Sequence, residues 1–329
     1  MSDETTTIVF ENIGVILNIP SETNATSFSA LGADIDIEPE TFTFALEAME
    51  PFPAIASNSD TWGLMATKAD SSKWSGKGVR VAILDTGMDL GHPDFKARNF
   101  VSKSFISGQT VQDLNGHGTH CTGTACGPLN PAYVQRYGIA YESKIFIGKV
   151  LSNSGTGTWG GALNGIDWAI QNNCEIISMS LGGTGSPMNA FEIAAKKALA
   201  SDSVIIAASG NSSRRPRYIA PTGIPANSPS IFAVASIDNR MKVAATSSGG
   251  KIEICAPGVQ VFSSYPRPQN HGTLSGTSMA CPHVAGIAAL WAQSDKALRG
   301  RKLLDKLSKS AKKIQGKKSD IGSGLVQAP

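Results

Sequence analysis

The sequence predicts an α/β fold: a doubly wound, mostly parallel sheet covered by helices on both faces, in three layers. Short apolar runs rich in β-branched residues and bounded by glycines recur along the chain, which is typical of buried strands. Segments with helical periodicity separate these runs, and such alternation favours a parallel sheet. The apolar runs are 79–84, 144–151, 175–181, 203–209 and 231–237, and the helical segments are 161–173, 189–202 and 279–293. In the last helix we expect Pro282 in the first turn, where its missing N–H costs nothing.

The composition is that of a folded protein. Of 329 residues, 41% are apolar and 17% charged, which excludes disorder for the bulk of the chain. Lys+Arg minus Asp+Glu is 29 − 26 = +3, which gives no argument for nucleic acid as a partner. No apolar stretch reaches the length of about 18 residues that predicts a membrane span. Leucines at helical spacing within the lysine-rich stretch 296–318 favour a solvated surface helix over a nucleic-acid tail.

The N-terminal part differs from the rest of the chain. No lysine or arginine precedes Lys68, and alternating apolar and polar residues before Met49 predict strands. A stretch rich in Pro, Ser and Ala near residues 50–60 predicts a linker. We therefore expect a small β-rich extension over residues 1–55 and a larger domain over residues 60–329.

The first residues and the cysteines predict a cytoplasmic location. The chain begins MSDETTT, with acids where a secretory signal carries bases. The five cysteines are scattered and form no CxxC pair, which favours buried free thiols in a reducing compartment over disulfides or a zinc site. A non-standard secretion route stays open.

Three glycine-rich motifs carry the residues of a nucleophilic site. Asp85 ends a predicted buried strand, at the edge where parallel sheets place functional groups. His117 lies between two glycines, and Ser278 starts a helix whose dipole favours developing negative charge. A serine nucleophile needs a base, and the base needs an acid that holds its tautomer. These three residues supply those roles, with Asp89 as an alternative acid that already lies in the loop.

The motifs DTGMDLGHPD, NGHGTH and SGTSMACPHVAG resemble those of the subtilisin-like serine proteases (peptidase S8 family), over about residues 60–329. The resemblance implies a subtilisin-like fold and a serine endopeptidase that hydrolyses peptide bonds through an acyl-enzyme. It makes Asp85 the orienting acid, His117 the general base and Ser278 the nucleophile. Asn211, in AASGN, becomes the side-chain donor to the oxyanion, beside the backbone N–H of Ser278.

The same resemblance implies a peptide-binding cleft. One wall is Gly155, Thr156 and Gly157, the other is Ser180, Leu181 and Gly182, and Gly223 lies at the base of the P1 pocket. Because no charge accompanies Gly223, we expect a large apolar or uncharged P1 residue. Protein or peptide substrates are the implied partners, with neither nucleic acid nor membrane. The N-terminal extension is expected to act as an intramolecular inhibitor that is cut near residues 50–60.

No cofactor is required by this chemistry, and calcium is the one metal to consider. Asp94 matches a family position that often ligates calcium, which makes a structural calcium ion the expectation there. The loop at residues 127–140 departs from the Asn-rich pattern usual beside that position, so the calcium site stays open.

Other patterns have alternative interpretations. Residues 155–160 fit GxGxxG with Glu175 about 20 residues on, as in a dinucleotide site, but the resemblance explains these glycines as cleft wall. The four histidines other than His117 are expected to be structural; they are His92, His120, His271 and His283. Two rival functions share the motifs: a non-catalytic peptide-binding relative, and a transpeptidase or maturase acting on one dedicated peptide.

Overall fold

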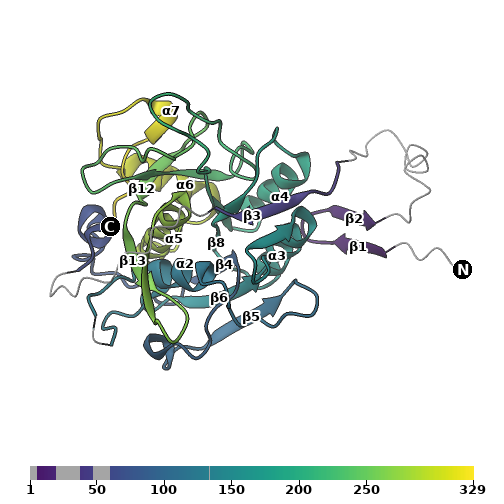
Figure 1. Ribbon diagram of the computed structural model, residues 1–329, viewed down its shortest axis with the longest axis horizontal. Helices are drawn as coiled ribbons and strands as arrows, with labels where there is room; N and C mark the ends of the chain where they lie inside the picture. Colours follow the sequence, from purple (N-terminus) through teal and green to yellow (C-terminus); the bar gives the residue numbers. More distant parts are fainter. Residues whose placement is uncertain (1–5, 20–37, 47–59, 133) are drawn as a thin grey trace, which may run out of the picture.

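The computed structural model describes residues 6–19, 38–46, 60–132 and 134–329, and at its centre lies a seven-stranded parallel sheet (Figure 1). Its strand order is β12-β11-β10-β8-β4-β6-β5. The strands are β4 (Arg80–Asp85), β5 (Phe100–Ser104), β6 (Lys144–Lys149), β8 (Ile176–Met179), β10 (Val204–Ala208), β11 (Phe232–Ile237) and β12 (Ile254–Pro257). The predicted mostly parallel sheet is confirmed.

Helices cover both faces of this sheet. One apolar core joins it to α2 and α5, and a second joins its other face to α3 and α4. The predicted three-layer α/β arrangement is therefore confirmed. The helices are α1 (Trp62–Thr67), α2 (His117–Cys126), α3 (Trp159–Gln171), α4 (Asn189–Ala200), α5 (Thr277–Ser294), α6 (Gly300–Ser310) and α7 (Lys318–Ile321), with a 3₁₀ turn at Pro93–Phe95.

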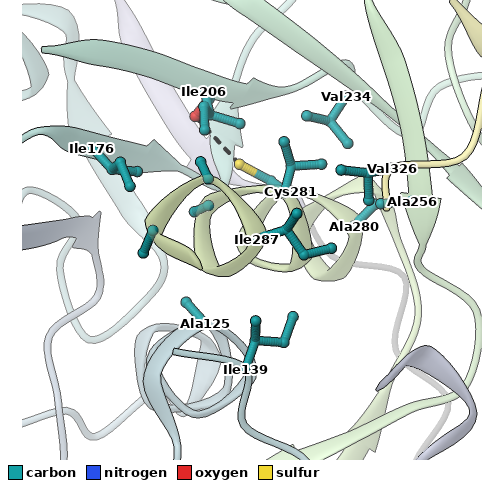
Figure 2. Packing of buried hydrophobic residues seen from close by; sticks show 14 of the residues in the cluster. Ala125, Ile139, Ile176, Ile206, Val234, Ala256, Ala280, Cys281, Ile287 and Val326 are labelled. Carbon is teal, nitrogen blue, oxygen red and sulfur yellow. Dashed lines mark hydrogen bonds between the residues drawn. The ribbon is translucent and has the colours of Figure 1, made fainter. Parts of the chain in front are cut away.

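The central helix α5 is apolar around most of its circumference, and Figure 2 shows how it fills the space between the sheet and α2. Cys281 points at the sheet and its thiol donates to the carbonyl of Ile206 at 3.3 Å. The helix begins two residues before the predicted start, so the expectation of Pro282 in the first turn is wrong. Pro282 has no N–H for the carbonyl of Ser278, which instead accepts the Ser180 hydroxyl at 2.8 Å.

The N-terminal extension packs against the larger domain. β1 (Thr6–Phe10) and β2 (Val15–Ile19) form an antiparallel hairpin beside α3 and α4 (Figure 1), and its Phe10 and Ile13 are buried in the second core. β3 (Phe42–Ala45) lies between β7 (Thr156–Thr158) and β9 (Leu181–Gly182) in a separate three-stranded sheet. The proposed linker near residues 50–60 falls almost wholly outside the described residues.

Two smaller features complete the chain. β13 (Val261–Ser264) and β14 (His271–Leu274) form an antiparallel ribbon just before α5. The lysine-rich segment forms α6, which buries Leu303, Leu304 and Leu307 and exposes Arg301 and Lys302, as expected of a surface helix.

Within the described residues, no helix combines the length and the apolar character that crossing a membrane requires.

The core around α5 predicts a large effect for one truncation. Ile287 is fully buried, so Ile287→Ala should lower the free energy of unfolding by about 2–5 kcal/mol through lost burial and a residual cavity. Denaturant unfolding of the parent protein and of the variant measures this loss. Ile193→Ala on exposed α4 surface is the matched control and should cost far less. Equal losses for both variants would contradict this packing.

Candidate active site

A buried acid and a buried base meet at the carboxyl end of the central strand β4. Asp85 ends β4 and His117 begins α2, and the Nδ1 atom of His117 lies 2.8 Å from Oδ1 of Asp85. Both side chains are almost completely buried. Burial by itself would lower the pKa of His117, but the adjacent Asp85 carboxylate outweighs it and holds that pKa well above its usual value.

A second buried carboxylate fixes the two segments that carry this pair. Asp113 accepts hydrogen bonds from the Thr86 hydroxyl, next to Asp85, and from the backbone and hydroxyl of Thr119, two residues after His117. The backbone N–H of Gly116 donates to the same carboxylate at 2.9 Å. The acid-bearing strand and the base-bearing helix therefore share one anchor, which fixes the distance between Asp85 and His117.

The hydroxyl of Ser278 lies at the N-terminus of α5, beside a carbonyl of the N-terminal extension. Its Oγ is 2.6 Å from the carbonyl oxygen of Leu46 and 3.1 Å from that of Ser180. The Asn211 side-chain N–H donates to the same Leu46 oxygen at 2.6 Å. Two Thr277 donors hold the other end of the Asn211 amide, which fixes its orientation.

Gly276, which precedes α5, allows this close approach. Its φ of +149° is a conformation that residues with a side chain rarely adopt, and a Cβ there would lie 2.8 Å from the Asn211 amide nitrogen and 3.2 Å from the Leu46 oxygen. A glycine at this position therefore leaves room for a carbonyl oxygen between Asn211 and Ser278.

His117 and Ser278 both contact Cys121, but the imidazole and the hydroxyl share no hydrogen bond. The Sγ atom of Cys121 lies 4.0 Å from Nδ1 of His117 and 3.5 Å from the backbone oxygen of Ser278, so the same side chain touches both residues. Nε2 of His117 is buried and has no partner among the described residues. The Ser278 hydroxyl instead faces the carbonyl oxygens of Leu46 and Ser180.

Both predicted cleft walls bind the backbone of β3. On one side, Thr43 pairs with Gly157, Phe44 with Thr156, and the N–H of Ala45 donates to the Gly155 carbonyl at 2.9 Å. On the other side, Phe44 pairs with Gly182 and Ala45 with Leu181, and the N–H of Leu46 lies 3.4 Å from the Ser180 carbonyl oxygen. Residues 156–158 form a paired strand here, which favours the cleft-wall interpretation over a dinucleotide loop.

The Leu46 side chain lies at the wall of a cavity of about 570 Å³, which Gly182, Gly210, Gly223 and Ile224 also line. None of the described residues around this cavity is charged. A Cβ on Gly182 would come within 3.0 Å of Cδ1 of Leu46, so that glycine leaves the side chain room to enter. Gly223, predicted at the base of a substrate pocket, is one of the residues that line this cavity.

The remaining polar candidates have other partners. Asp89 forms a bidentate pair with Arg267 at 2.8–2.9 Å; burial opposes its ionisation, but Arg267 holds its pKa well below the usual range. Burial lowers the pKa of His120 to about 3 and that of His283 to about 4, and each ring bonds a backbone carbonyl. These neutral, carbonyl-bound rings suit structural roles.

Asp94 lies in the 3₁₀ turn after β4 and has its own set of hydrogen-bond partners. Its Oδ1 accepts the backbone N–H of Ala132 at 2.8 Å. Its Oδ2 accepts the hydroxyl of Tyr137 at 2.7 Å and lies 2.7 Å from Nε2 of His271. The carboxylate is thus surrounded by hydrogen-bond donors.

Two residues of this site were not assigned from the sequence. The sequence around Leu46 gives no signal of its role. An apolar residue after a short strand is common, and nothing in it indicates that its backbone carbonyl will accept a hydrogen bond from Asn211. Asp113 lies inside the motif that contains His117, four residues before it. An acid that close to a candidate base was a signal that could have marked it as an anchor.

The chain belongs to the subtilase family, the class of subtilisin-type serine proteases, because the family profile matches residues 76–324. It is 38% identical to subtilisin DY from Bacillus licheniformis, over 80% of this chain and 94% of that protein. It is 36% identical to subtilisin from Bacillus pumilus, over 82% of this chain and 98% of that protein. It is also 36% identical to a thermostable alkaline protease of Halalkalibacterium halodurans, over 83% of this chain and 73% of that protein.

These relatives overturn one expectation. The predicted cytoplasmic location is wrong, because the Bacillus subtilisins are secreted, extracellular proteases. All five cysteines are free and buried, as expected. Their burial raises the pKa of both Cys255 and Cys281 to about 12, which keeps the reactive thiolate form scarce. Such shielded thiols survive in an oxidising medium too, so they carry no information about compartment.

The buried pair predicts a titration result. Asp85→Asn should lower the pKa of His117, because burial still disfavours the imidazolium while the neutral amide no longer stabilises it. The NMR titration of the His117 ring, in a Ser278→Ala background, measures this. Asp89→Asn, which removes a carboxylate bonded to Arg267, is the matched control and should leave His117 unchanged. The assignment of Asp85 as its charge partner fails if His117 titrates alike in the Asp85→Asn protein and its parent.

Proposed function

We propose that this chain is a serine endopeptidase in which Asp85, His117 and Ser278 form the catalytic triad. One observation carries the proposal: the carbonyl oxygen of Leu46 lies 2.6 Å from both the Ser278 hydroxyl and the Asn211 side-chain N–H. Acyl transfer needs a peptide carbonyl next to both a nucleophile and a preorganised oxyanion donor, and the Leu46 carbonyl lies beside both groups. Membership of the subtilase family supports the same chemistry.

The reaction starts with attack of the Ser278 oxygen on the carbonyl carbon of the bound peptide. The hydroxyl turns from the carbonyl oxygens it now faces toward Nε2 of His117, which accepts its proton. The Asp85 carboxylate holds Nδ1 and stabilises the imidazolium. His117 then gives the proton to the leaving amine, which departs as the C–N bond breaks. Water attacks the remaining acyl-enzyme with His117 again as base and releases the acid.

The negative charge on the tetrahedral oxygen is stabilised by two donors. Asn211 supplies its side-chain N–H from a fixed orientation. Ser278 is the second residue of α5, where a backbone N–H has no acceptor within the helix and is available to the oxyanion. The helix dipole favours negative charge at the same place.

The substrate is an extended peptide with a large apolar or uncharged P1 residue. Backbone pairing with residues 155–157 on one side and 180–182 on the other adds the peptide as a strand between two others. The uncharged cavity around Leu46 takes the P1 side chain. A charged P1 group would lose its hydration there without gaining a partner.

The N-terminal extension acts as an intramolecular inhibitor, because it occupies this cleft as a substrate would. Its acids also cap two helices: Glu40 accepts the N–H of Gly160 at 2.9 Å, and Glu38 accepts those of Asn189 and Ala190 at 2.6 and 3.0 Å. Negative charge is favourable at the N-terminal ends of α3 and α4. The extension therefore binds through the hairpin, the helix caps and the cleft strand together.

The bond that this extension offers to Ser278 is Leu46–Glu47, earlier than the predicted cut near residues 50–60. The Thr43 hydroxyl is buried without a partner among the described residues, a cost that opposes binding of the strand.

Two rival functions were a non-catalytic relative and a peptide transferase. No observation on the described residues favours either of them, and the relatives' names are those of proteases.

Loss of the nucleophile tests the proposal. Ser278→Ala should reduce hydrolysis of a denatured protein by about 10⁶-fold, the size found for subtilisin itself, and should abolish fluorophosphonate labelling. Asn211→Ala should lower kcat by about 10²–10³-fold with little change in KM, because its donor acts mainly on the oxyanion. Asn172→Ala, at the end of α3, is the matched control and should be silent. Full activity of Ser278→Ala would refute the proposed function.

Mass spectrometry of the purified chains tests processing. The parent protein should begin at Glu47, whereas Ser278→Ala should keep its whole N-terminal extension. Leu46→Glu should slow the cut, because the uncharged cavity does not stabilise a carboxylate. Leu90→Glu, on the exposed surface of the larger domain, is the matched control and should be processed normally. The assignment of the bond fails if the parent begins elsewhere or if both variants are cut at the same rate.

A further inference from the structure

A cluster of polar and aromatic side chains around Asp94 is not used by the proposed mechanism. The Asp94 side chain is fully buried, and its two oxygens accept three hydrogen-bond donors. They come from distant parts of the chain: the backbone of Ala132, the hydroxyl of Tyr137 and Nε2 of His271. The carboxylate therefore joins the turn after β4, the loop after α2 and the first residue of β14.

The His271 ring is held in place from three sides. The Phe262 ring stacks on it with centroids 5.6 Å apart and planes at 20°, and the Tyr137 and His92 rings meet it edge-on. His92 is fixed in turn, since its Nδ1 accepts the Asp94 N–H and its Nε2 lies 2.6 Å from the Asn270 carbonyl oxygen. This orientation aims Nε2 of His271 at the Asp94 carboxylate.

These residues do not fit the calcium ion that the family resemblance predicts at Asp94. Calcium takes six to eight oxygen ligands. Here an N–H, an O–H and an imidazole nitrogen occupy the Asp94 oxygens, and a second imidazole lies beside them. Three donors use most of the roughly four acceptor sites of the carboxylate, and two of these donors are nitrogen groups, whereas calcium is bound through oxygen.

A transition metal held by His92, Asp94 and His271 fits no better. The ligand atoms that these residues offer lie within 4.8 Å of one another. However, the 2.7 Å between Nε2 of His271 and Oδ2 of Asp94 is a hydrogen-bond distance. Two ligands of one zinc ion lie roughly 3.3 Å apart, given metal–ligand bonds of about 2.0–2.1 Å.

We infer that the donors of His271, Tyr137 and Ala132 take the place of calcium at Asp94, so that this subtilase is stabilised at that position without a metal ion. The cluster ties β14, which leads into the helix carrying Ser278, to the turn after β4 and to the loop after α2. The inference does not depend on the proposed catalytic roles.

Calorimetric melting of the full-length Ser278→Ala chain, which cannot digest itself, tests the absence of calcium. The Tm should be the same with excess EDTA, with millimolar calcium chloride and with zinc chloride. A Tm raised by calcium, and lost again on adding EDTA, would overturn the inference in favour of a calcium site. A rise with zinc that disappears in His271→Gln would overturn it in favour of a zinc site.

Substitutions within the cluster test the replacement itself. Asp94→Asn and His271→Gln should each lower the Tm by roughly 3–8 °C, because each removes a buried charge-assisted hydrogen bond. The double variant should lose clearly less than the sum of the two, since both changes break the same contact. Strictly additive losses would overturn the inference.

Two further variants keep the test decisive. Glu142→Gln removes a carboxylate that pairs with Lys77 at 4.0 Å on the exposed surface, and it should leave the Tm unchanged. If either cluster variant fails to fold, Tyr137→Phe removes only a hydroxyl donor and should still lower the Tm. An effect of Tyr137→Phe no larger than that of Glu142→Gln would overturn the inference.

Discussion

The hydrogen bond between two buried side chains, Asp85 and His117, is the constraint on which the rest of the site depends. A buried carboxylate is costly unless it is paired, and the pair holds only if both backbones are fixed. Asp113 fixes both backbones, because it accepts hydrogen bonds from Thr86, which follows Asp85, and from Thr119, which lies in the helix of His117. Because Asp85 ends the central strand β4 and His117 begins α2, the carboxyl edge of the sheet is where the site forms.

The cleft and the N-terminal extension use the same backbone geometry. β7 and β9 face each other across a gap one strand wide, and β3 fills it with antiparallel pairs on both sides. Unpaired strand edges bind extended peptide, whether it belongs to this chain or to another. The proposed inhibition by the extension and the proposed recognition of a substrate therefore rest on the same open pair of strand edges. The proposed cut after Leu46 follows from where that strand ends.

Sequence motifs pointed to Asp85, His117 and Ser278 as candidate residues, and they were less informative about the hydrogen-bond partners of buried side chains. Asp94 was recognised as a family position, yet its partners are Tyr137 and His271, which no motif joins to it. Pro282 was placed in the first turn of its helix, but α5 starts earlier because Gly276 and Thr277 are fixed beside Asn211. The compartment was misjudged because buried thiols are protected wherever the protein is.

The sequence by itself determined the α/β class, the main strands and helices, and the residues offered for catalysis. Those features depend on local periodicity and on short motifs, so neighbouring residues suffice to reveal them. Tertiary structure alone decided the strand order, the carbonyl that faces Ser278 and the donors around Asp94. Leu46 and Ser278 are 232 positions apart, and Asp94 and His271 are 177 apart. Contacts over such separations depend on the tertiary structure, because no local pattern specifies which distant segment will lie beside another.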